Sequence, residues 1–202
     1  MTTVLSSLFV SLDGVAEVDP DWHFPYFDEH MSAAVSHDYE GTDVMVLGRV
    51  TYDSFAEAWP AREEAGDVDA PFAKQLGDTR KVVATRGGDE LGWRNVSATD
   101  DVLGTVQALR TESGVNKVLI AGSLSIVRQL LRAGELDELS LLVHPVIAGK
   151  GERLFEQVDL QPLRLVSSAA FPTGVVHLHY AKADFPNANQ YEHIVDKAPT
   201  GE

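Results

Sequence analysis

The chain has 202 residues with 31 acidic and 16 basic side chains, which give a formal net charge of −15 at pH 7. Its length suits one domain with a single core, and so negative a charge disfavours nucleic acid and anionic membrane surfaces as partners. No apolar run approaches the ~18 residues of a membrane span, and the absence of cysteine removes any disulfide framework. With no secretory signal pattern at the N-terminus, we expect a cytoplasmic protein.

Apolar and turn-forming residues predict strands that alternate with helices along the chain. The expected strands span residues 3–10, 44–47, 81–84, 117–120, 138–143, 163–170 and 175–181. The expected helices cover residues 26–37, 50–58, 71–76 and 102–109, followed by one that carries Ile126, Val127, Leu130 and Leu131 on one face before Gly134. Trp59-Pro60 is expected to end the second helix, and the acidic residues 61–69 are expected to form an exposed loop.

Strands that alternate with helices and then close in a hairpin indicate an α/β domain with a mostly parallel sheet. We expect three layers, with an antiparallel C-terminal edge built by residues 163–170 and 175–181. In this interpretation, residues 1–184 form a single domain. The segment 185–202 has no strong periodicity and is expected to be a mobile or partner-bound C-terminal tail.

Three of the expected strand ends carry residues suited to an anion. In an open parallel sheet, ligands bind beyond the carboxyl ends of the strands, where helix N-termini offer free N–H groups. Taken singly, a glycine there is a turn residue, a serine is an N-cap and an arginine is a solvated side chain. Together, three such ends suit a dinucleotide with two or three phosphates. The residues are Gly48, Arg49 and Thr51, then Thr85 and Arg86, and finally Gly122, Ser123, Leu124 and Ser125.

Other motifs of known chemistry are absent or weak. The sequence has no G-x-G-x-x-G, no P-loop, no G-x-S-x-G and no H-E-x-x-H, which disfavours a Rossmann dehydrogenase, a P-loop enzyme and a serine hydrolase. His177 and His179 share one side of an expected strand, in a geometry that a metal could use. Without cysteine nearby, a polar side that faces solvent is favoured, so we expect no metal site.

Two acidic side chains lie nearest the expected ligand cleft. Asp13 follows the first strand, and Asp28 opens the first long helix together with Glu29. An acid at a helix start is also simply favourable with the helix dipole, so a catalytic role for Asp28 needs further support.

The segment VMVLGRVTYDSF, together with VLIAGSLSIVRQLLRAGELDELSLLVHPVIAGKGERLF, resembles the dihydrofolate reductase-like superfamily. It looks closest to the branch that contains the reductase domain of the bifunctional riboflavin-biosynthesis deaminase/reductase, the RibD C-terminal domain. The resemblance covers about residues 3–182, with SLDG, LGRVTY, ATR and the glycine turn in the family's order. It implies a three-layer dihydrofolate reductase-like α/β fold whose last strand is antiparallel.

The resemblance also implies NADPH as the cofactor, lying across the carboxyl edge of the sheet. Where dihydrofolate reductases have two adjacent glycines, this chain has Ala121-Gly122-Ser123, so one glycine is matched. The SLDG loop with Gly14 would cover the nicotinamide. The implied contacts are Gly48, Arg49 and Thr51 to the phosphates, Thr85 and Arg86 to the adenosine 2′-phosphate, and Gly122, Ser123, Leu124 and Ser125 to the pyrophosphate.

On the substrate side, the match to dihydrofolate reductases is incomplete. Those enzymes hold the pterin with a carboxylate that follows a W-x-x-P stretch. Here Phe27 stands where that acid is expected, and Asp28 is one position along, a rotation of about 100° on a helix. We therefore expect an NADPH-dependent reductase of another small heterocycle, resembling 5-amino-6-(5-phosphoribosylamino)uracil reductase of riboflavin biosynthesis. Asp13 and Asp28 are the catalytic candidates, and Gly14 and Trp22 are the substrate-binding candidates.

Three alternatives remain open for the function. They are dihydrofolate reductase-type pterin reduction, nucleotide binding without catalysis, and reduction through another cofactor such as a deazaflavin. Besides a small-molecule substrate, we expect a second copy of the chain as partner. Residues 138–143 and the following HPVIAGKGERLF resemble the part through which riboflavin-type members form homodimers.

Overall fold

A computed structural model describes residues 1–87 and 90–185. It contains an eight-stranded sheet in the order β4-β3-β2-β5-β1-β6-β8-β7. The strands are β1 (Thr3–Ser11), β2 (Val44–Gly48), β3 (Arg80–Ala84), β4 (Val96–Thr99), β5 (Lys117–Ile120), β6 (Glu138–His144), β7 (Leu163–Ala170) and β8 (Val176–Lys182). The expected α/β fold, with a mostly parallel sheet and an antiparallel C-terminal edge, is confirmed. The tail expected at residues 185–202 lies outside the described residues apart from residue 185.

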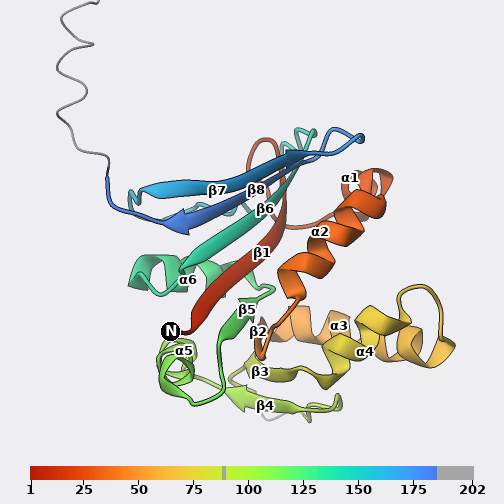
Figure 1. Cartoon of the computed structure of the whole chain (residues 1–202), viewed down its shortest axis with the longest axis vertical. Coiled ribbons are helices and arrows are strands. Elements are labelled where there is room, and N and C mark those ends of the chain that lie inside the picture. The colour runs from red at the N-terminus through yellow and green to blue at the C-terminus, as the bar shows by residue number, and fades with distance from the viewer. Residues whose placement is uncertain (88–89, 186–202) are drawn as a thin grey trace, which may run out of the picture.

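Helices cover both faces of this sheet and produce the three layers seen in Figure 1. The helical segments are α1 (Pro20–His23), the 3-10 turn η1 (Phe24–Tyr26), α2 (Glu29–Tyr39), α3 (Arg49–Ala65), α4 (Ala70–Asp78), α5 (Val102–Thr111) and α6 (Leu124–Ala133). One layer holds α2, α3 and α4, and the other holds α5 and α6. In the part of the chain that the structure describes, no helix is both long and apolar enough to cross a membrane.

The alternating side chains of β2 contribute to both cores. Val44 and Val46 pack into the cluster that includes α5 and α6, whereas Met45 and Leu47 pack into the cluster that includes α3 and α4. All five residues of the strand are buried. A strand covered on both faces has a continuous apolar sequence, which is why VMVL predicted its position.

Strand direction changes only toward the C-terminal end of the described sheet. β1 pairs in parallel with β5 and β6, and β2 pairs in parallel with β3 and β5. β8 returns antiparallel to β6, and β7 pairs antiparallel with β8. The parallel strands bring their carboxyl ends to one edge, which is where ligands bind in sheets of this kind.

β6 lies inside the sheet and not at its surface. It pairs with β1 on one side and with β8 on the other, and most of its residues are buried. Residues 138–143 therefore have little free surface, and the homodimer expected through them and the segment that follows stays a prediction. The strand at this end of the sheet is β7, and all eight of its residues are exposed.

The expected helix end at Pro60 is also wrong. α3 continues to Ala65, which places residues 61–65 of the expected loop in the helix. A proline inside a helix lacks the N–H that would bond to the carbonyl four residues earlier. The ring of Trp59, next to it, packs edge-on against Phe72 of α4, with 5.2 Å between centroids. Tertiary packing of this kind outweighs the local cost of the proline.

Two other segments hold elements that the sequence did not predict. The connection after β3 contains the short strand β4, which pairs in parallel with β3. α1 and η1 precede the first long helix, where the sequence predicted no helix, and α2 begins at Glu29 rather than at residue 26. Asp28 caps this helix, because its Oδ1 accepts the backbone N–H of Met31 over 2.9 Å.

His177 and His179 do not face solvent as the sequence predicted. Their side chains are 14% and 19% exposed. Nε2 of His177 lies 2.7 Å from Oγ of Ser140, and Nε2 of His179 lies 3.0 Å from a carboxylate oxygen of Glu138, both on the neighbouring strand β6. Residues 1–87 and 90–185 contain no cluster of three or more His, Cys, Asp or Glu side chains suited to a metal ion.

Asp38 fastens the C-terminal end of α2 to the sheet. Its side chain is fully buried, and Oδ2 accepts the hydroxyl of Ser7 on β1 over 2.7 Å and that of Ser140 on β6 over 2.6 Å. Since the Ser140 hydroxyl donates to Asp38, its oxygen accepts the Nε2–H of His177. Burial acts to raise the pKa of Asp38, but hydrogen bonds from His177, Ser140 and Ser7 lower it below its usual value.

Candidate functional site

Two glycine corners meet at the carboxyl edge of the sheet. The backbone N–H of Gly48 donates to the carbonyl oxygen of Gly122 over 3.0 Å. A Cβ atom added to Gly48 would lie 2.6 Å from Oγ of Ser123, and one added to Gly122, whose φ is +119°, would lie 3.0 Å from Oγ1 of Thr51. The peptide bond between Gly122 and Ser123 is cis. The corners after β2 and β5 are therefore packed against each other, and both require glycine.

The helices that begin at these corners have N-termini without side-chain caps. Gly48 is the N-cap of α3 and Ser123 is the N-cap of α6, and neither makes a side-chain hydrogen bond to its helix. The hydroxyl of Ser123 instead lies 2.8 Å from that of Ser125. The first N–H groups of a helix have no partners within it and carry partial positive charge. Two such ends side by side suit a phosphate or pyrophosphate group.

Arg49, Thr85 and Arg86 lie at the same edge of the sheet as the glycine corners. Arg49 is the first residue of α3, and its Nε lies 2.8 and 2.9 Å from the two carboxylate oxygens of Asp53. β3 pairs in register with β2, so Thr85 and Arg86 follow β3 at the same edge. The structure thus brings the three predicted strand ends together on the neighbouring strands β3, β2 and β5.

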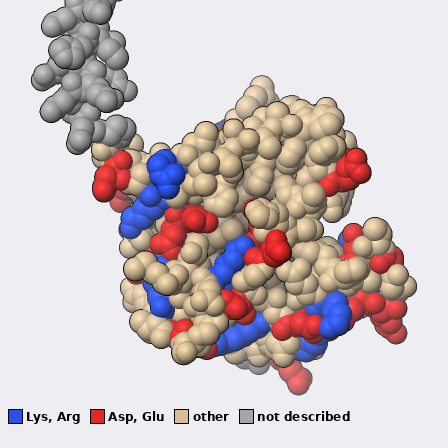
Figure 2. All heavy atoms as spheres, in the orientation of Figure 1, with Lys and Arg blue, Asp and Glu red and all other residues tan. Residues whose placement is uncertain are grey.

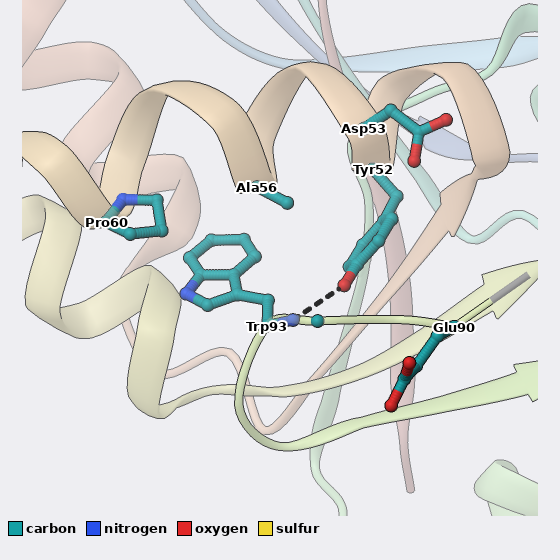
Figure 3. A pocket seen from close by; sticks show the side chains of 7 residues that line it. Tyr52, Asp53, Ala56, Pro60, Glu90 and Trp93 are labelled. Atoms are coloured by element: carbon teal, nitrogen blue, oxygen red, sulfur yellow. Dashed lines mark hydrogen bonds between the residues drawn. The ribbon is translucent and has the colours of Figure 1, made fainter.

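A cavity of about 440 Å³ lies along α3, and the sequence interpretation did not foresee it. It lies between α3 and the segment that leads into β4. In Figure 3 the ring of Trp93 lies beneath Ala56 and Pro60 of α3. The backbone N–H of Trp93 donates to the hydroxyl of Tyr52 over 2.9 Å, which holds this segment against the helix. The lining residues are Tyr52, Asp53, Ala56, Pro60, Glu90, Gly92 and Trp93.

The turn after β1 is held to the segment that follows β6. The N–H of Gly14, whose φ is +85°, donates to the carbonyl of Ser11, and the carbonyl of Gly14 accepts the N–H of Leu154, both over 2.9 Å. Val15 and Arg153 form an antiparallel bridge. These bonds fix the turn that was expected to cover the cofactor. The substrate-binding role of Gly14 stays a prediction.

Asp13 accepts several hydrogen bonds at this junction. Its Oδ1 accepts the hydroxyl of Ser11 over 2.7 Å and the N–H of Ala148 over 2.9 Å, and its Oδ2 accepts the N–H of Gly149 over 3.0 Å. These bonds, led by that of Ser11, lower the pKa of Asp13 to about 2. The side chain is therefore a carboxylate at neutral pH, which suits orientation of its neighbours better than proton supply. Its catalytic role stays a prediction.

Trp22 and Asp28 lie in different surroundings. Trp22 is 9% exposed and lines a cavity of about 350 Å³ at the carboxyl edge. Asp28 serves as the N-cap of α2 and is not among the residues that line this cavity. Its catalytic role also stays a prediction. The lining residues are Glu17, Val18, Asp19, Pro20, Trp22, Ala148, Lys150 and Gly151.

Two buried histidines lie behind Trp22, and the sequence interpretation missed both. Nδ1 of His23 in α1 lies 3.2 Å from Nε2 of His144, the last residue of β6. The ring of Trp22 packs edge-on against His144, with 4.9 Å between centroids. Burial lowers the pKa of both histidines, that of His23 to about 4. They are 121 positions apart in the chain, so no local motif links them.

The sheet order and the paired glycine corners define a protein of the dihydrofolate reductase-like class. A family model described as the RibD C-terminal domain matches residues 2–177. The chain belongs to this family. The resemblance noted in the sequence is therefore confirmed.

Two relatives from Bacillus subtilis (strain 168) match most of the chain. The uncharacterized protein YyaP is 26% identical over 188 residues, which cover 88% of this chain and 93% of YyaP. The uncharacterized protein YwjB is 30% identical over 179 residues, which cover 86% of this chain and 94% of YwjB.

Solved structures share the fold at low sequence identity. A putative riboflavin biosynthesis protein from Shewanella sp. PV-4 has a TM-score of 0.64 and 19% identity over 91% of this chain and all of that one. A pyrimidine reductase-like protein from Corynebacterium diphtheriae has a TM-score of 0.59 and 18% identity, covering 91% and 93%. Acinetobacter baumannii RibD has a TM-score of 0.62 and 14% identity, covering 91% of this chain and 58% of RibD.

The RibD C-terminal family is reductase-like, and its members typically bind a nicotinamide cofactor. The residues of this chain fit such a group. The N-termini of α3 and α6 have no side-chain caps, a feature that suits phosphates, and Arg49 and Arg86 stand at the same edge. The glycines at both corners keep the backbone open to close approach.

Proposed function

We propose that this protein is an NADPH-dependent reductase of a small heterocyclic substrate, of the type of 5-amino-6-(5-phosphoribosylamino)uracil reductase. The observation that carries the proposal is the pair of helix N-termini without side-chain caps that meet at Gly48 and Gly122. A chain with a net charge of −15 does not attract anions through its overall field. An anion site in this protein therefore has to use local groups such as helix N-termini. A dinucleotide pyrophosphate is the anion that two adjacent helix ends suit best.

The cofactor contacts divide among the three strand ends. NADPH, when bound, supplies the hydride. The protein holds the cofactor against the substrate and excludes water from the reacting atoms. We assign the pyrophosphate to Gly122, Ser123, Leu124 and Ser125, the adjoining phosphate contacts to Gly48, Arg49 and Thr51, and the adenosine 2′-phosphate to Thr85 and Arg86.

We place the substrate in the cavity beside Trp22. This cavity lies at the carboxyl ends of β1 and β6, and Asp13 accepts N–H groups of Ala148 and Gly149 in or next to its wall. Asp13 therefore acts as a positioning residue for that wall, and the turn at Gly14 is fixed beside it. Asp28 positions the start of α2 as its N-cap.

Pterin reduction of the dihydrofolate reductase type has less support. It needs a carboxylate at the position of Phe27, but Phe27 is apolar and 45% exposed. Asp28, the next residue, already binds the N–H of Met31. Two alternatives remain: nucleotide binding without turnover, and use of a deazaflavin in place of NADPH. The titration described below distinguishes both from the leading proposal.

We further propose that the protein forms a homodimer through β7. In this strand Leu163, Leu165 and Val166 are 39%, 48% and 50% exposed. In Figure 2 the surface over β7 and β8 carries few charged side chains, whereas acidic and basic groups gather over the lower part of the view. An unpaired edge strand with apolar side chains favours association with another strand. A cytoplasmic location stays a prediction from the sequence.

Titration of the full chain with NADPH, followed by fluorescence, tests the function. Binding followed by NADPH consumption with an aminopyrimidine substrate is the expected result. Binding without consumption across pyrimidine and pterin substrates would favour the non-catalytic alternative. Consumption with dihydropterins alone would favour pterin reduction, and binding of a deazaflavin but not of NADPH would favour the third alternative.

A further inference from the structure

The ring of His144 bonds to the backbone of Leu142 and of Val10, and we assign its proton from the contact to Leu142. Nδ1 of His144 lies 3.0 Å from the carbonyl oxygen of Leu142. A carbonyl oxygen only accepts, so Nδ1 is the donor in this bond. A neutral imidazole has a single N–H, which leaves Nε2 of His144 as an acceptor.

The same reasoning determines the form of His23. Nδ1 of His23 lies 3.2 Å from the acceptor Nε2 of His144, so Nδ1 of His23 is the donor. Its Nε2 is then left without a proton and is free to accept a hydrogen bond. The bond to the carbonyl of Leu142 thus places the proton of both imidazoles on Nδ1 and leaves Nε2 of His23 as an acceptor.

The surroundings of the pair keep both rings neutral. His23 and His144 are 6% and 0% exposed, and this burial disfavours the charged form of each. The ring of Phe9 lies 4.3 Å from that of His23, and the ring of Phe27 lies 5.6 Å from it. Proton donation by this pair at neutral pH is therefore disfavoured, and hydrogen-bond acceptance is favoured.

Nε2 of His23 makes no hydrogen bond within the described residues. It is thus a buried acceptor without a partner in this part of the chain, because the residue is 6% exposed.

Aromatic side chains surround the ring of His23. Trp22, the preceding residue, lines the cavity of about 350 Å³. Phe24 and Phe27 are 63% and 45% exposed, and their rings lie 5.2 and 5.6 Å from that of His23. Aromatic faces next to a hydrogen-bond acceptor suit a flat heterocycle with an N–H at its edge.

We propose that His23 is a specificity-determining residue of the substrate site, whose Nε2 accepts a hydrogen bond from an N–H group of a neutral heterocycle. The inference rests on the proposed function, because it takes the substrate to bind at the edge where Trp22 lies. An acceptor without a proton favours ring N–H and amino groups. It disfavours N-methylated rings and phosphate groups, which have no donor to offer.

Nitrogen-15 NMR of the histidine rings in the full chain tests the first part of the inference. At neutral pH we expect both His23 and His144 with the proton on Nδ1. A proton on Nε2 of His23 would overturn the assignment. This measurement needs neither NADPH nor turnover, so its failure is distinct from failure of the proposed function.

Binding of 6-aminouracil and of its fully N-methylated form tests the second part. We expect 6-aminouracil to shift the Nε2 signal of His23 and to bind about 5-fold more tightly than the methylated probe, as one net hydrogen bond allows. His23→Asn retains a donor near His144 but has no atom at Nε2, and is expected to lose this preference. His23→Gln, which reaches the Nε2 position, is expected to retain part of it.

His37→Asn is the matched control, because the side chain of His37 is 77% exposed on α2. It is expected to bind both probes as the unmodified chain does. Equal affinity for the two probes, no binding of 6-aminouracil, or a His23→Asn variant that keeps the preference would each overturn the proposal. Preference for 6-aminouracil in a chain that does not bind NADPH would instead contradict the proposed function alone.

Discussion

Gly48 and Gly122 are in direct backbone contact, with the N–H of the first 3.0 Å from the carbonyl oxygen of the second. Ser123 closes the space beside them, because a Cβ on Gly48 would lie 2.6 Å from its Oγ and 2.8 Å from its Cβ. This contact places the N-termini of α3 and α6 next to each other. The proposed cofactor site depends on it.

Gly48→Ala is expected to weaken NADPH binding by at least about 10-fold, because contacts this short force the two helix ends apart. Fluorescence titration measures the affinity, and circular dichroism checks that the variant folds. Gly92→Ala is the control, since a Cβ there meets no atom within 4 Å. A folded Gly48→Ala variant with unchanged affinity would show that the phosphates bind elsewhere.

Arg86→Gln is expected to reduce the preference for NADPH over NADH. Arg86 follows β3 at the carboxyl edge and is exposed, so it is free to pair with a 2′-phosphate. We expect the NADPH affinity to fall about 10-fold, which is the size of one charge-assisted contact, while the NADH affinity stays the same. Arg80→Gln, at the opposite end of the same strand, is expected to change neither. Equal losses for both cofactors would contradict the assignment of Arg86.

Much of the fold follows from local sequence patterns, and the exceptions have identifiable causes. Continuous apolar runs such as VMVL predict strands that are buried on both faces. Pro60 is misleading because its local cost is outweighed by packing of Trp59 against Phe72. The strand Val96–Thr99 lacks an apolar run, since its burial is only partial at the end of the sheet.

The candidate site likewise contains some residues that the sequence predicts and others that it does not. The glycine corners were predictable because each one combines a turn residue with a helix start. The His23–His144 pair was not, because its members come from α1 and β6 and meet only through the tertiary fold. Ser7, Asp38, Ser140 and His177 likewise come from four separate elements, so their hydrogen bonds have no local signature.

The stability of the protein is expected to fall as the pH drops from about 6.5 to about 4. Folding lowers the pKa of His23 from 6.5 to about 4, so the unfolded chain binds more protons in this window. The stabilisation is thus complete above the unfolded pKa and is lost as the pH falls toward the folded one. For His23 the difference amounts to roughly 3 kcal/mol at 1.36 kcal/mol per pKa unit.

Urea unfolding at a series of pH values measures this dependence. His23→Asn is expected to flatten the curve in this window, whereas His37→Asn, at an exposed position, is expected to leave it unchanged. Asp38 acts at lower pH, because its lowered pKa stabilises the fold until the carboxylate is protonated. A His23→Asn variant with the original slope would contradict a buried neutral imidazole.

Replacing Leu165 and Val166 together by lysine is expected to prevent dimer formation. Both lie on the exposed strand β7, and two like charges on each strand would repel across the proposed contact. Sedimentation is expected to show a dimer for the unmodified chain and a 22.0 kDa species for the variant. Val68→Lys, at a residue 93% exposed outside the sheet, is the control. A 22.0 kDa species for the unmodified chain would contradict the dimer.

The most direct test of the cofactor site compares NADPH binding by the unmodified chain and by Arg49→Gln. Arg49 begins α3 at the contact between the glycine corners, whereas Arg62 lies near the other end of the same helix. We expect saturable binding at micromolar NADPH, a loss of about 10-fold in Arg49→Gln and no change in Arg62→Gln. Absence of saturable binding, or equal affinity in all three proteins, would contradict the account.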